Sequence, residues 1–413
     1  MSSGRDRERP TALVIGAGLA GLAAAERLAR AGWEVTVLEA RERLGGRVWS
    51  QRLQGGGLIE RGGEFITGGY DVTEATAARL GIALDGMSIS YPDRELRPGP
   101  GPDRAALLAG AEAAAGAATT APGGSNAAAA LEAAVDDASV REVLAVRLQS
   151  AVAHPFAALD ARFLVHLPAL VATSETRRLR GGNQSLATAL AARLGAPVRT
   201  GAAVREVRRE GASVRAVGDG GLDASAAACV VAVPLALLGE LRFDPPLPDR
   251  QRDAIAAIPT SRAAKLAVPL SEPTAPRALM SGTHRFWAWT TPCDGVGGRV
   301  VNGWAGSGPT LEELAVADGP AGWIAALGVL WPELEPDGSA ALLTDWQRDP
   351  WARGAYSVLP GVEDPDGSAA AVAPAPNLAF AGEHTAEPAW TGTIEGALRS
   401  GIRAADELLG RRG

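Results

Sequence analysis

Apolar and polar positions near the amino terminus predict a strand, a helix and a second strand in close succession. A short apolar run at Leu13–Ile15 indicates the first strand, and the Ala- and Leu-rich stretch after it indicates a helix. A second apolar run, Val35–Leu38, indicates another strand and is followed by an acid, Glu39. The succession predicts a βαβ unit.

Three glycines occupy the turn between the first strand and the helix, at Gly16, Gly18 and Gly21. In this pattern the first glycine allows a tight turn, the second lets the backbone approach a pyrophosphate, and the third lets the helix pack closely on the sheet. The free N–H groups of the helix attract phosphate, and Glu39 is placed to accept hydrogen bonds from a ribose diol. The unit therefore predicts a dinucleotide site, and the context disfavours an ordinary βα turn.

Later patterns indicate a second domain and a return to the first. Residues 105–148 are Ala-rich with Leu and Val at helical spacing, which predicts surface helices. We expect a flexible amino terminus at residues 1–10, a discontinuous nucleotide-binding domain, and a second domain between its parts. The nucleotide-binding domain is predicted at residues 11–70, 175–245 and 375–413, and the second domain at residues 71–174 and 246–374.

Composition narrows the class of partner. The chain has 413 residues, is 46% hydrophobic and carries a net charge of −7, which argues against a nucleic-acid surface. Cys229 and Cys293 do not form a disulfide framework, and the four histidines are scattered, so we expect no metal site. No apolar run is long enough to cross a membrane, and a cytoplasmic location follows as the default.

Motifs spread over most of the chain resemble those of the flavin-containing amine oxidases, a family that includes monoamine, polyamine and L-amino-acid oxidases. The match is poorest at residues 100–150. The matching segments are GAGLAGL (16–22), LEARERLGGRVW (38–49), RGGEFI (61–66), RGGNQSLATAL (180–190), VVAVP (230–234), WQRDPW (346–351), GAY (354–356), FAGEHT (380–385) and WTGTIEGALRSG (390–401), together with Lys265.

The resemblance implies an α/β fold in which a Rossmann-like FAD-binding domain of the glutathione-reductase type is interleaved with a mixed-sheet and helical substrate domain. It also implies FAD as the cofactor. Ala355 stands where some relatives carry a flavin-linking cysteine, so we expect the FAD to be non-covalent. The implied FAD-binding residues are Gly16, Gly18, Gly21, Glu39, Arg41, Gly46, Arg47, Gly63, Glu64, Phe65, Val204, Trp346, Gly382, Glu383, Thr393 and Ile394.

Lys265 is the only lysine among 40 basic residues, and it falls where the family carries a lysine that is hydrogen-bonded through water to flavin N5. A lysine is a compact charge whose pKa falls readily on burial, whereas an arginine stays protonated. From the residues alone, a strand lysine that reaches solvent is the alternative. With the surrounding motifs, we expect Lys265 to assist the reaction of the reduced flavin with O2.

The substrate pocket departs from the family pattern. The family places two aromatic rings beside the amine, and Tyr356 matches one of them, but Thr393 stands where the second is expected. Trp390, Trp346, Trp287 and Trp289 are candidates to compensate. Residues 64–66 also lack the arginine with which amino-acid oxidases bind a carboxylate, which disfavours an α-carboxylate substrate.

The resemblance implies oxidation of an amine C–N bond by hydride transfer to flavin N5, with O2 reduced to H2O2. Lys265 and Tyr356 are the predicted catalytic residues. A desaturase or C–C dehydrogenase of the protoporphyrinogen-oxidase type is the alternative enzyme, and a flavin-binding assembly protein is the non-enzymatic one. The sequence leaves open the identity of the amine, oxidase against dehydrogenase, and monomer against homodimer.

Overall fold

The computed structural model describes residues 9–53, 57–291, 298–359, 373 and 375–410. The chain divides into two compact units, each assembled from separated segments. Unit 1 comprises residues 1–46, 186–258 and 364–413, and unit 2 comprises residues 47–185 and 259–363. The expected mixed α/β fold is confirmed.

The compact units divide the chain at other positions than the predicted domains, whose extent stays a prediction. Residues 47–70 and 175–185 belong to unit 2, where the Arg61 side chain donates to the Thr344 hydroxyl and the backbone of Leu179 pairs with that of Leu84. Residues 246–258 belong to unit 1, where the Gln251 side chain donates to the carbonyl of Ala373.

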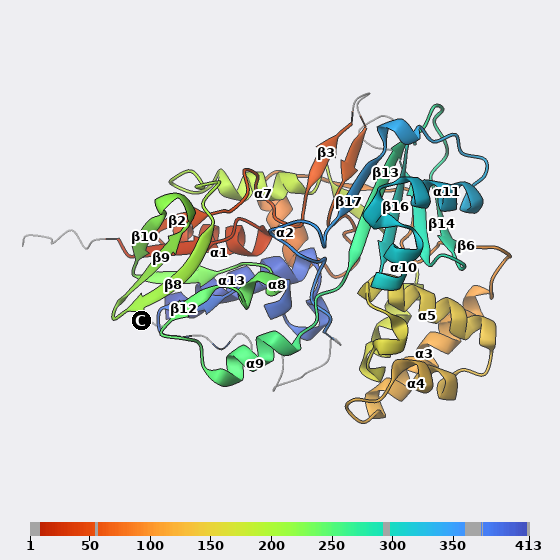
Figure 1. Cartoon of the computed structure of the whole chain (residues 1–413), viewed down its shortest axis with the longest axis horizontal. Helices are drawn as coiled ribbons and strands as arrows, with labels where there is room; N and C mark the ends of the chain where they lie inside the picture. The colour runs from red at the N-terminus through yellow and green to blue at the C-terminus, as the bar shows by residue number, and fades with distance from the viewer. Residues whose placement is uncertain (1–8, 54–56, 292–297, 360–372, 374, 411–413) are drawn as a thin grey trace, which may run out of the picture. The chain divides into compact units, whose positions relative to one another are not determined.

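Unit 1 contains a four-stranded parallel sheet with the order β18-β11-β1-β2. Every residue of β11 is buried, as is typical of a parallel sheet covered on both faces. A second sheet has the order β10-β9-β8-β12, and its four strands are labelled in Figure 1. The elements of unit 1 are β1 (Thr11–Ile15), α1 (Leu19–Arg30), β2 (Glu34–Leu38), α7 (Gln184–Ala191, from residue 186), β8 (Val204–Glu210), β9 (Ser213–Gly218), β10 (Asp223–Ala226), β11 (Ala228–Val231), α8 (Leu235–Leu238), β12 (Arg242–Asp244), α9 (Asp249–Ala257), β18 (Leu378–Phe380) and α13 (Ile394–Gly410).

Unit 2 is built on a six-stranded sheet with the order β17-β13-β16-β15-β14-β6. Two-stranded pairs join β3 to β4 and β5 to β7. The strands of unit 2 are β3 (Ser50–Arg52), β4 (Leu58–Glu60), β5 (Leu84–Gly86), β6 (Glu95–Arg97), β7 (Arg177–Leu179), β13 (Ala263–Pro269), β14 (Arg277–Ser281), β15 (Phe286–Thr290), β16 (Val300–Gly306) and β17 (Leu342–Asp345). Its helices are α2 (Asp71–Arg79), α3 (Arg104–Thr120), α4 (Ala127–Ala134), α5 (Ala138–Val152), α6 (Leu167–Val171), α10 (Gly308–Glu313) and α11 (Ala321–Leu330).

The two faces of the six-stranded sheet have different chemistry, because successive side chains of a strand point to opposite faces. On one face, Leu266 and Phe286 pack in an apolar core with Trp323 of α11. On the other face, Trp287 and Trp289 form a separate cluster with partly buried aromatic rings. Lys265 alternates with the apolar-core residues of β13, so it lies on the aromatic face.

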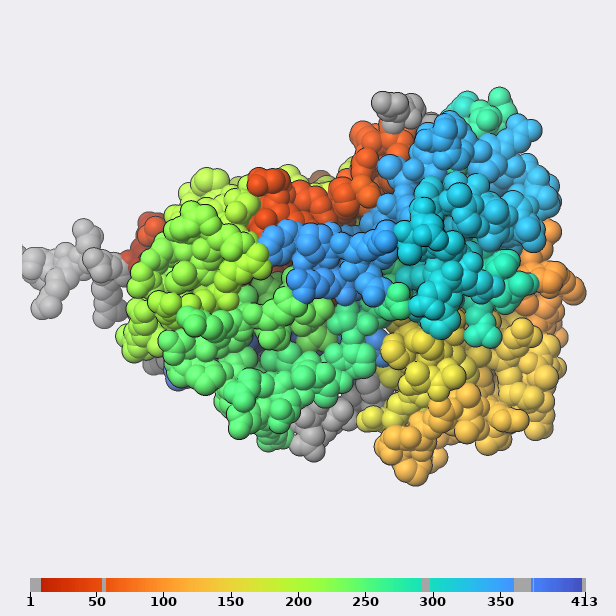
Figure 2. All heavy atoms as spheres, in the orientation of Figure 1, coloured from red at the N-terminus to blue at the C-terminus, as the bar shows by residue number. Residues whose placement is uncertain are grey.

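The Ala-rich region forms helices with a core of their own. Ala111, Ala114 and Leu144 are fully buried among α3, α4, α5 and α6, so these helices are more than a surface layer. In the space-filling view the yellow and orange side chains of these helices form one contiguous block (Figure 2). Small side chains allow the helices to approach closely: a Cβ at Gly110 would lie 2.6 Å from a methyl of Val140.

Two further expectations concern single residues and the membrane. Cys229 is a free, buried side chain, and burial raises the pKa of its thiol. Cys293 and residues 1–8 lie outside the described part of the chain. Within that part, no helix combines the length and the apolar character that a membrane crossing requires.

Candidate active site

The glycine turn of unit 1 has the packing that its three glycines predict. Gly16 has a φ of +103°, and a Cβ there would lie 2.6 Å from the carbonyl oxygen of Ala232. A Cβ at Gly21 would lie 1.9 Å from the carbonyl oxygen of Gly16, so α1 packs directly on the turn. Apart from its chain neighbours, no described residue has an atom within 4 Å of a Cβ at Gly18. The first and third glycines are thus required by the fold, and the open space at Gly18 fits the close approach of a diphosphate.

Glu39 closes this turn from the end of β2. Its side chain is 4% exposed, and its carboxylate accepts hydrogen bonds from the backbone N–H groups of Ala17 (2.7 Å) and Arg41 (2.9 Å). The backbone N–H of Ala202 donates to the Glu39 carbonyl at 2.8 Å, which brings the segment before Val204 alongside. The acid predicted to bind a ribose is therefore held at the turn predicted to bind the phosphates.

A second glycine turn lies against the first. Gly46 has a φ of +59°, and a Cβ there would lie 3.3 Å from the Cα of Gly18. Arg47 follows it and begins unit 2, where its Nη1 donates to the carbonyl of Ala355 at 2.6 Å. Contacts of Arg41 and Arg47 with a diphosphate stay predictions.

The segment before α13 is fixed by side-chain hydrogen bonds. Gly382 has a φ of +142°, and the carboxylate of the adjacent Glu383 accepts from the backbone N–H of Gly392 at 2.9 Å. The Oγ1 of Thr393 accepts from the N–H of Gly396 at 2.9 Å, as an N-cap residue does. Capping explains a threonine at a position where the family resemblance implies an aromatic ring.

Helices α1 and α13 run in the same direction. A Cβ at Gly401 would lie 2.1 Å from the carbonyl oxygen of Ala20, and further along both helices Arg27 pairs with Asp406 at 2.8 Å. The amino-terminal ends of both helices therefore face the same side of unit 1, and α13 begins roughly two turns beyond the start of α1. Two partial positive charges at this side suit an anionic ligand.

Lys265 is buried in unit 2, so the alternative of a lysine that reaches solvent is wrong. It is 4% exposed, and its Nζ donates to the Glu64 carboxylate at 2.5 Å and to the Gly62 carbonyl at 3.2 Å. Glu64 is also 4% exposed, and Nη1 of Arg178 lies 3.9 Å from its Oε1. The lysine therefore stabilises the loop that carries the RGGEF sequence as well as facing the aromatic side of the sheet.

Glu60 and Asn183 support this loop and were not selected from the sequence. Glu60 is 2% exposed and accepts hydrogen bonds from the Ser50 hydroxyl and from the Asn183 N–H. Burial is the main cause that raises the pKa of Glu60 to about 7, and the nearby charge of Glu64 adds to the shift. The Asn183 side chain donates to the carbonyls of Gly63 and Glu64. The sequence could have pointed to both, because Glu60 directly precedes the RGGEFI motif and Asn183 lies within the RGGNQSLATAL motif.

Trp346, the residue that follows β17, holds the same loop. It is 2% exposed, and its indole N–H donates to the Arg61 carbonyl at 3.0 Å. A Cβ at Gly62 would lie 3.0 Å from the Trp346 ring and 1.8 Å from the carbonyl oxygen of Arg47. Within the described contacts, Trp346 therefore shapes the glycine turn, and its own contact with a cofactor stays a prediction.

The aromatic face of the sheet forms a continuous wall. Trp287 and Trp289 stack with ring centroids 4.1 Å apart, and Phe65 lies 5.2 Å from the first and 5.3 Å from the second. Tyr91 packs edge-on against Trp287 at 5.4 Å. The Nζ of Lys265 lies 5.4 Å from the centroid of Trp289, so the lysine stands at one end of this wall.

Tyr356 has an aromatic neighbour that the sequence did not reveal. Its hydroxyl donates to the Ala151 carbonyl, and its ring stacks nearly parallel to Trp304, with centroids 6.4 Å apart and 7° between the planes. Trp304 lies directly across from Lys265 in the β13–β16 register. Trp390, a predicted compensating ring, lies in unit 1, where the Arg399 guanidinium is 5.2 Å from its centroid.

The parallel sheet with its glycine turn and the buried acid Glu39 define the class of dinucleotide-binding proteins. A model of the flavin containing amine oxidoreductase family matches residues 19–409. AofH of Mycobacterium tuberculosis, named as a flavin-containing monoamine oxidase, is 30% identical over 96% of each chain. An L-amino acid dehydrogenase of a Synechocystis species is 24% identical over 96% of this chain and 94% of its own.

Solved structures give the same fold. Putrescine oxidase bound to putrescine matches with a TM-score of 0.82 and 20% identity, covering 97% of this chain and 100% of its own. Cyclohexylamine oxidase from Brevibacterium oxydans matches with a TM-score of 0.83 and 20% identity, covering 98% and 99%.

The chain belongs to the flavin-containing amine oxidoreductase family. It is an FAD-dependent enzyme that oxidises amines, as the sequence motifs predicted. The roles of individual residues stay predictions.

Proposed function

We propose that this enzyme is an oxidase that transfers the electrons of an amine to O2, with Lys265 and Tyr356 beside the reacting groups. The observation that carries the proposal is the burial of Lys265 on the aromatic face, paired to the loop that the resemblance places beside the flavin ring. A buried cation near the site of oxygen reduction would stabilise negative charge as it develops.

The residues of unit 1 fit an FAD. The open space at Gly18, the buried carboxylate of Glu39 and the two helix ends on one side would hold the adenosine diphosphate part. When bound, FAD would supply a two-electron acceptor for the hydride of the amine α-carbon and would pass those electrons on to O2. Ala355 has no side-chain nucleophile, so acid precipitation is expected to release the FAD into solution.

The residues of unit 2 would bind the amine and exclude water. Trp304 and Tyr356 stack with parallel planes and offer ring faces to a neutral amine, which makes Trp304 the candidate for the ring missing at position 393. Phe65, Trp287 and Trp289 would form an apolar wall that keeps the reacting carbon dry. These residues position the substrate, and the reaction requires no protein nucleophile.

Anaerobic titration of the purified yellow protein against a panel of primary, secondary and diamine substrates tests this proposal. At least one amine should bleach the flavin absorbance, and O2 should restore the colour with formation of H2O2. Bleaching that only an artificial electron acceptor reverses would make the enzyme a dehydrogenase. If no amine bleaches the flavin but a C–C substrate does, amine oxidation is refuted. A cytoplasmic location and a homodimer stay predictions.

A further inference from the structure

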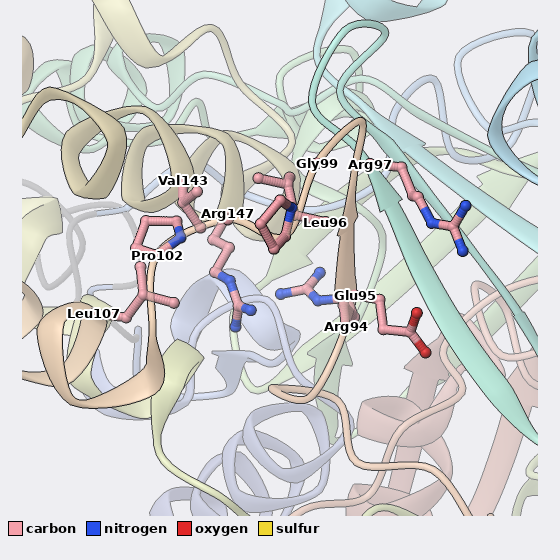
Figure 3. Close-up of a pocket in the computed structure, with 11 residues that line it drawn as sticks. Arg94, Glu95, Leu96, Arg97, Gly99, Pro102, Leu107, Val143 and Arg147 are labelled. Carbon is pink, nitrogen blue, oxygen red and sulfur yellow. The ribbon is translucent and has the colours of Figure 1, made fainter.

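A pocket of about 460 Å³ in unit 2 contains two buried arginines. It lies between β6, the Pro- and Gly-rich loop at residues 99–102, and helices α3 and α5. Figure 3 shows the guanidinium groups of Arg94 and Arg147 pointing toward each other, while the side chains of Glu95 and Arg97 point away from them.

Arg94 is a buried cation that has no counter-charge within the part of the chain that the structure describes. It is 4% exposed, and none of its three guanidinium nitrogens has a hydrogen-bond partner among the described residues. Its Cζ lies 4.4 Å from the ring centroid of Tyr91 and 5.0 Å from that of Trp287. Cation–π contacts offset part of the desolvation cost, but they leave every N–H donor of the guanidinium unused.

Arg147 is held so that it adds a second positive charge to the same pocket. It is 5% exposed, and its Nη1 donates to the carbonyls of Pro92 (2.6 Å) and Leu170 (2.8 Å). Burial and the neighbouring Arg94 lower the pKa of Arg147 to about 9, so it remains protonated at neutral pH. Burial also lowers the pKa of Arg94, and the neighbouring Tyr91 opposes this shift.

The acidic residues next to Arg94 in the sequence, Asp93 and Glu95, form ion pairs with other arginines. Glu95 forms a two-pronged ion pair with Arg277, in which Nη2 lies 2.6 Å from the carboxylate. Asp93 pairs with Arg104, and both of these side chains are more than one-third exposed. Two guanidinium groups that face each other in a buried pocket repel, and an anion between them would relieve both the repulsion and the unused donors.

We propose that Arg94 and Arg147 form an anion-binding subsite for a carboxylate at the far end of the amine substrate. Trp287 contacts Arg94 and stacks on Trp289, which lies beside Lys265. The guanidinium of Arg94 and the ammonium of Lys265 therefore lie at opposite ends of the stacked pair of tryptophans. The carboxylate of an α-amino acid is one bond from the reacting carbon and could not span this pair, so the subsite selects amines whose carboxylate is several carbons away.

This proposal rests on the proposed function for its substrate and can be tested separately from it. The first measurement is kcat/KM for 4-aminobutyrate, 6-aminohexanoate and 8-aminooctanoate, each against the alkylamine of the same length. For at least one chain length, the wild type should have a kcat/KM for the amino-carboxylate that is at least about tenfold higher than for the alkylamine. A factor of about ten is what one charge-assisted hydrogen bond contributes. Arg94→Met should abolish this preference, and Arg97→Met, which lines the same pocket but points away, should keep it.

The second measurement is thermal unfolding of the FAD-loaded protein with hexanoate or hexanamide. Hexanoate should raise the melting temperature of the wild type and of Arg97→Met but not of Arg94→Met, and hexanamide should raise none. Arg94→Met alone should melt no lower than the wild type, because it removes an uncompensated buried charge; a lower melting temperature would make Arg94 a structural residue and overturn the proposal.

The remaining outcomes separate the sources of the anion. If phosphate or chloride stabilises the wild type as well as hexanoate does, and amino-carboxylates are not preferred, the carboxylate assignment is overturned. If neither an anion effect nor a substrate preference is found, the subsite itself is overturned. If no amine is oxidised but hexanoate still stabilises only the proteins that retain Arg94, the proposed oxidase function fails and the anion subsite stands.

Discussion

Replacing Lys265 by Met tests the structural and the chemical role of the buried lysine at once. The change keeps much of the apolar stem but removes the charge that pairs with Glu64, and both side chains are 4% exposed. Breaking a buried ion pair by removing one partner typically costs about 3–5 kcal/mol, because the other charge is left without compensation. Arg178 remains 3.9 Å from Glu64, so we expect a loss near the lower end, about 3 kcal/mol.

Urea unfolding of the FAD-loaded variant, followed by flavin fluorescence, measures this loss. The double variant Lys265→Met/Glu64→Gln should recover most of it, because it removes both members of the Lys265–Glu64 ion pair. Arg277→Met is the matched control on the same sheet: its ion pair with Glu95 is partly exposed, and its loss should cost less than about 1 kcal/mol. A loss below about 1 kcal/mol in Lys265→Met, or no recovery in the double variant, would refute the reasoning.

The rate at which O2 reoxidises the reduced flavin, measured by stopped flow, then separates the structural role of Lys265 from its role in the reaction. Lys265→Met should retain FAD and reoxidise more slowly with O2, and the double variant should be stable but equally slow. Reoxidation at the wild-type rate in both variants would leave Lys265 with only a structural role.

Two further predictions concern the buried carboxyl group of Glu60 and the glycine turn at residues 16–21. Because the pKa of Glu60 is raised from 4.5 to about 7, the folded state holds its proton more tightly than the unfolded chain, so this group should lower the stability by about 3 kcal/mol as pH rises from 4.5 to 7. Glu60→Gln should remove that slope in unfolding measured between pH 4.5 and 8, and equal slopes in both proteins would contradict it. At the turn, Gly18→Ala should cost the apoprotein less than about 1 kcal/mol yet weaken FAD binding by about tenfold or more, because its Cβ enters open space. Gly21→Ala should destabilise the apoprotein by about 3 kcal/mol, because its Cβ would lie 1.9 Å from the Gly16 carbonyl oxygen; equal melting temperatures for the two variants would contradict this distinction.

The sequence by itself determined the βαβ unit, its glycine turn, the acid at Glu39 and the family. These features are local: a turn that needs a positive φ selects glycine, and a parallel buried strand selects an apolar run, so both leave a direct trace in the order of residues. The single lysine was also visible as an exception to the bias toward arginine.

The tertiary structure decided which side chains meet. The pairing of Lys265 with Glu64, the hydrogen bond from Asn183 to Glu60 and the stacking of Trp304 on Tyr356 join segments that lie far apart in the chain. Strand register and sheet faces bring them together, and no local pattern encodes a partner from a distant strand. The lack of a counter-charge at Arg94 belongs to the same class, because burial and pairing are properties of the packed molecule.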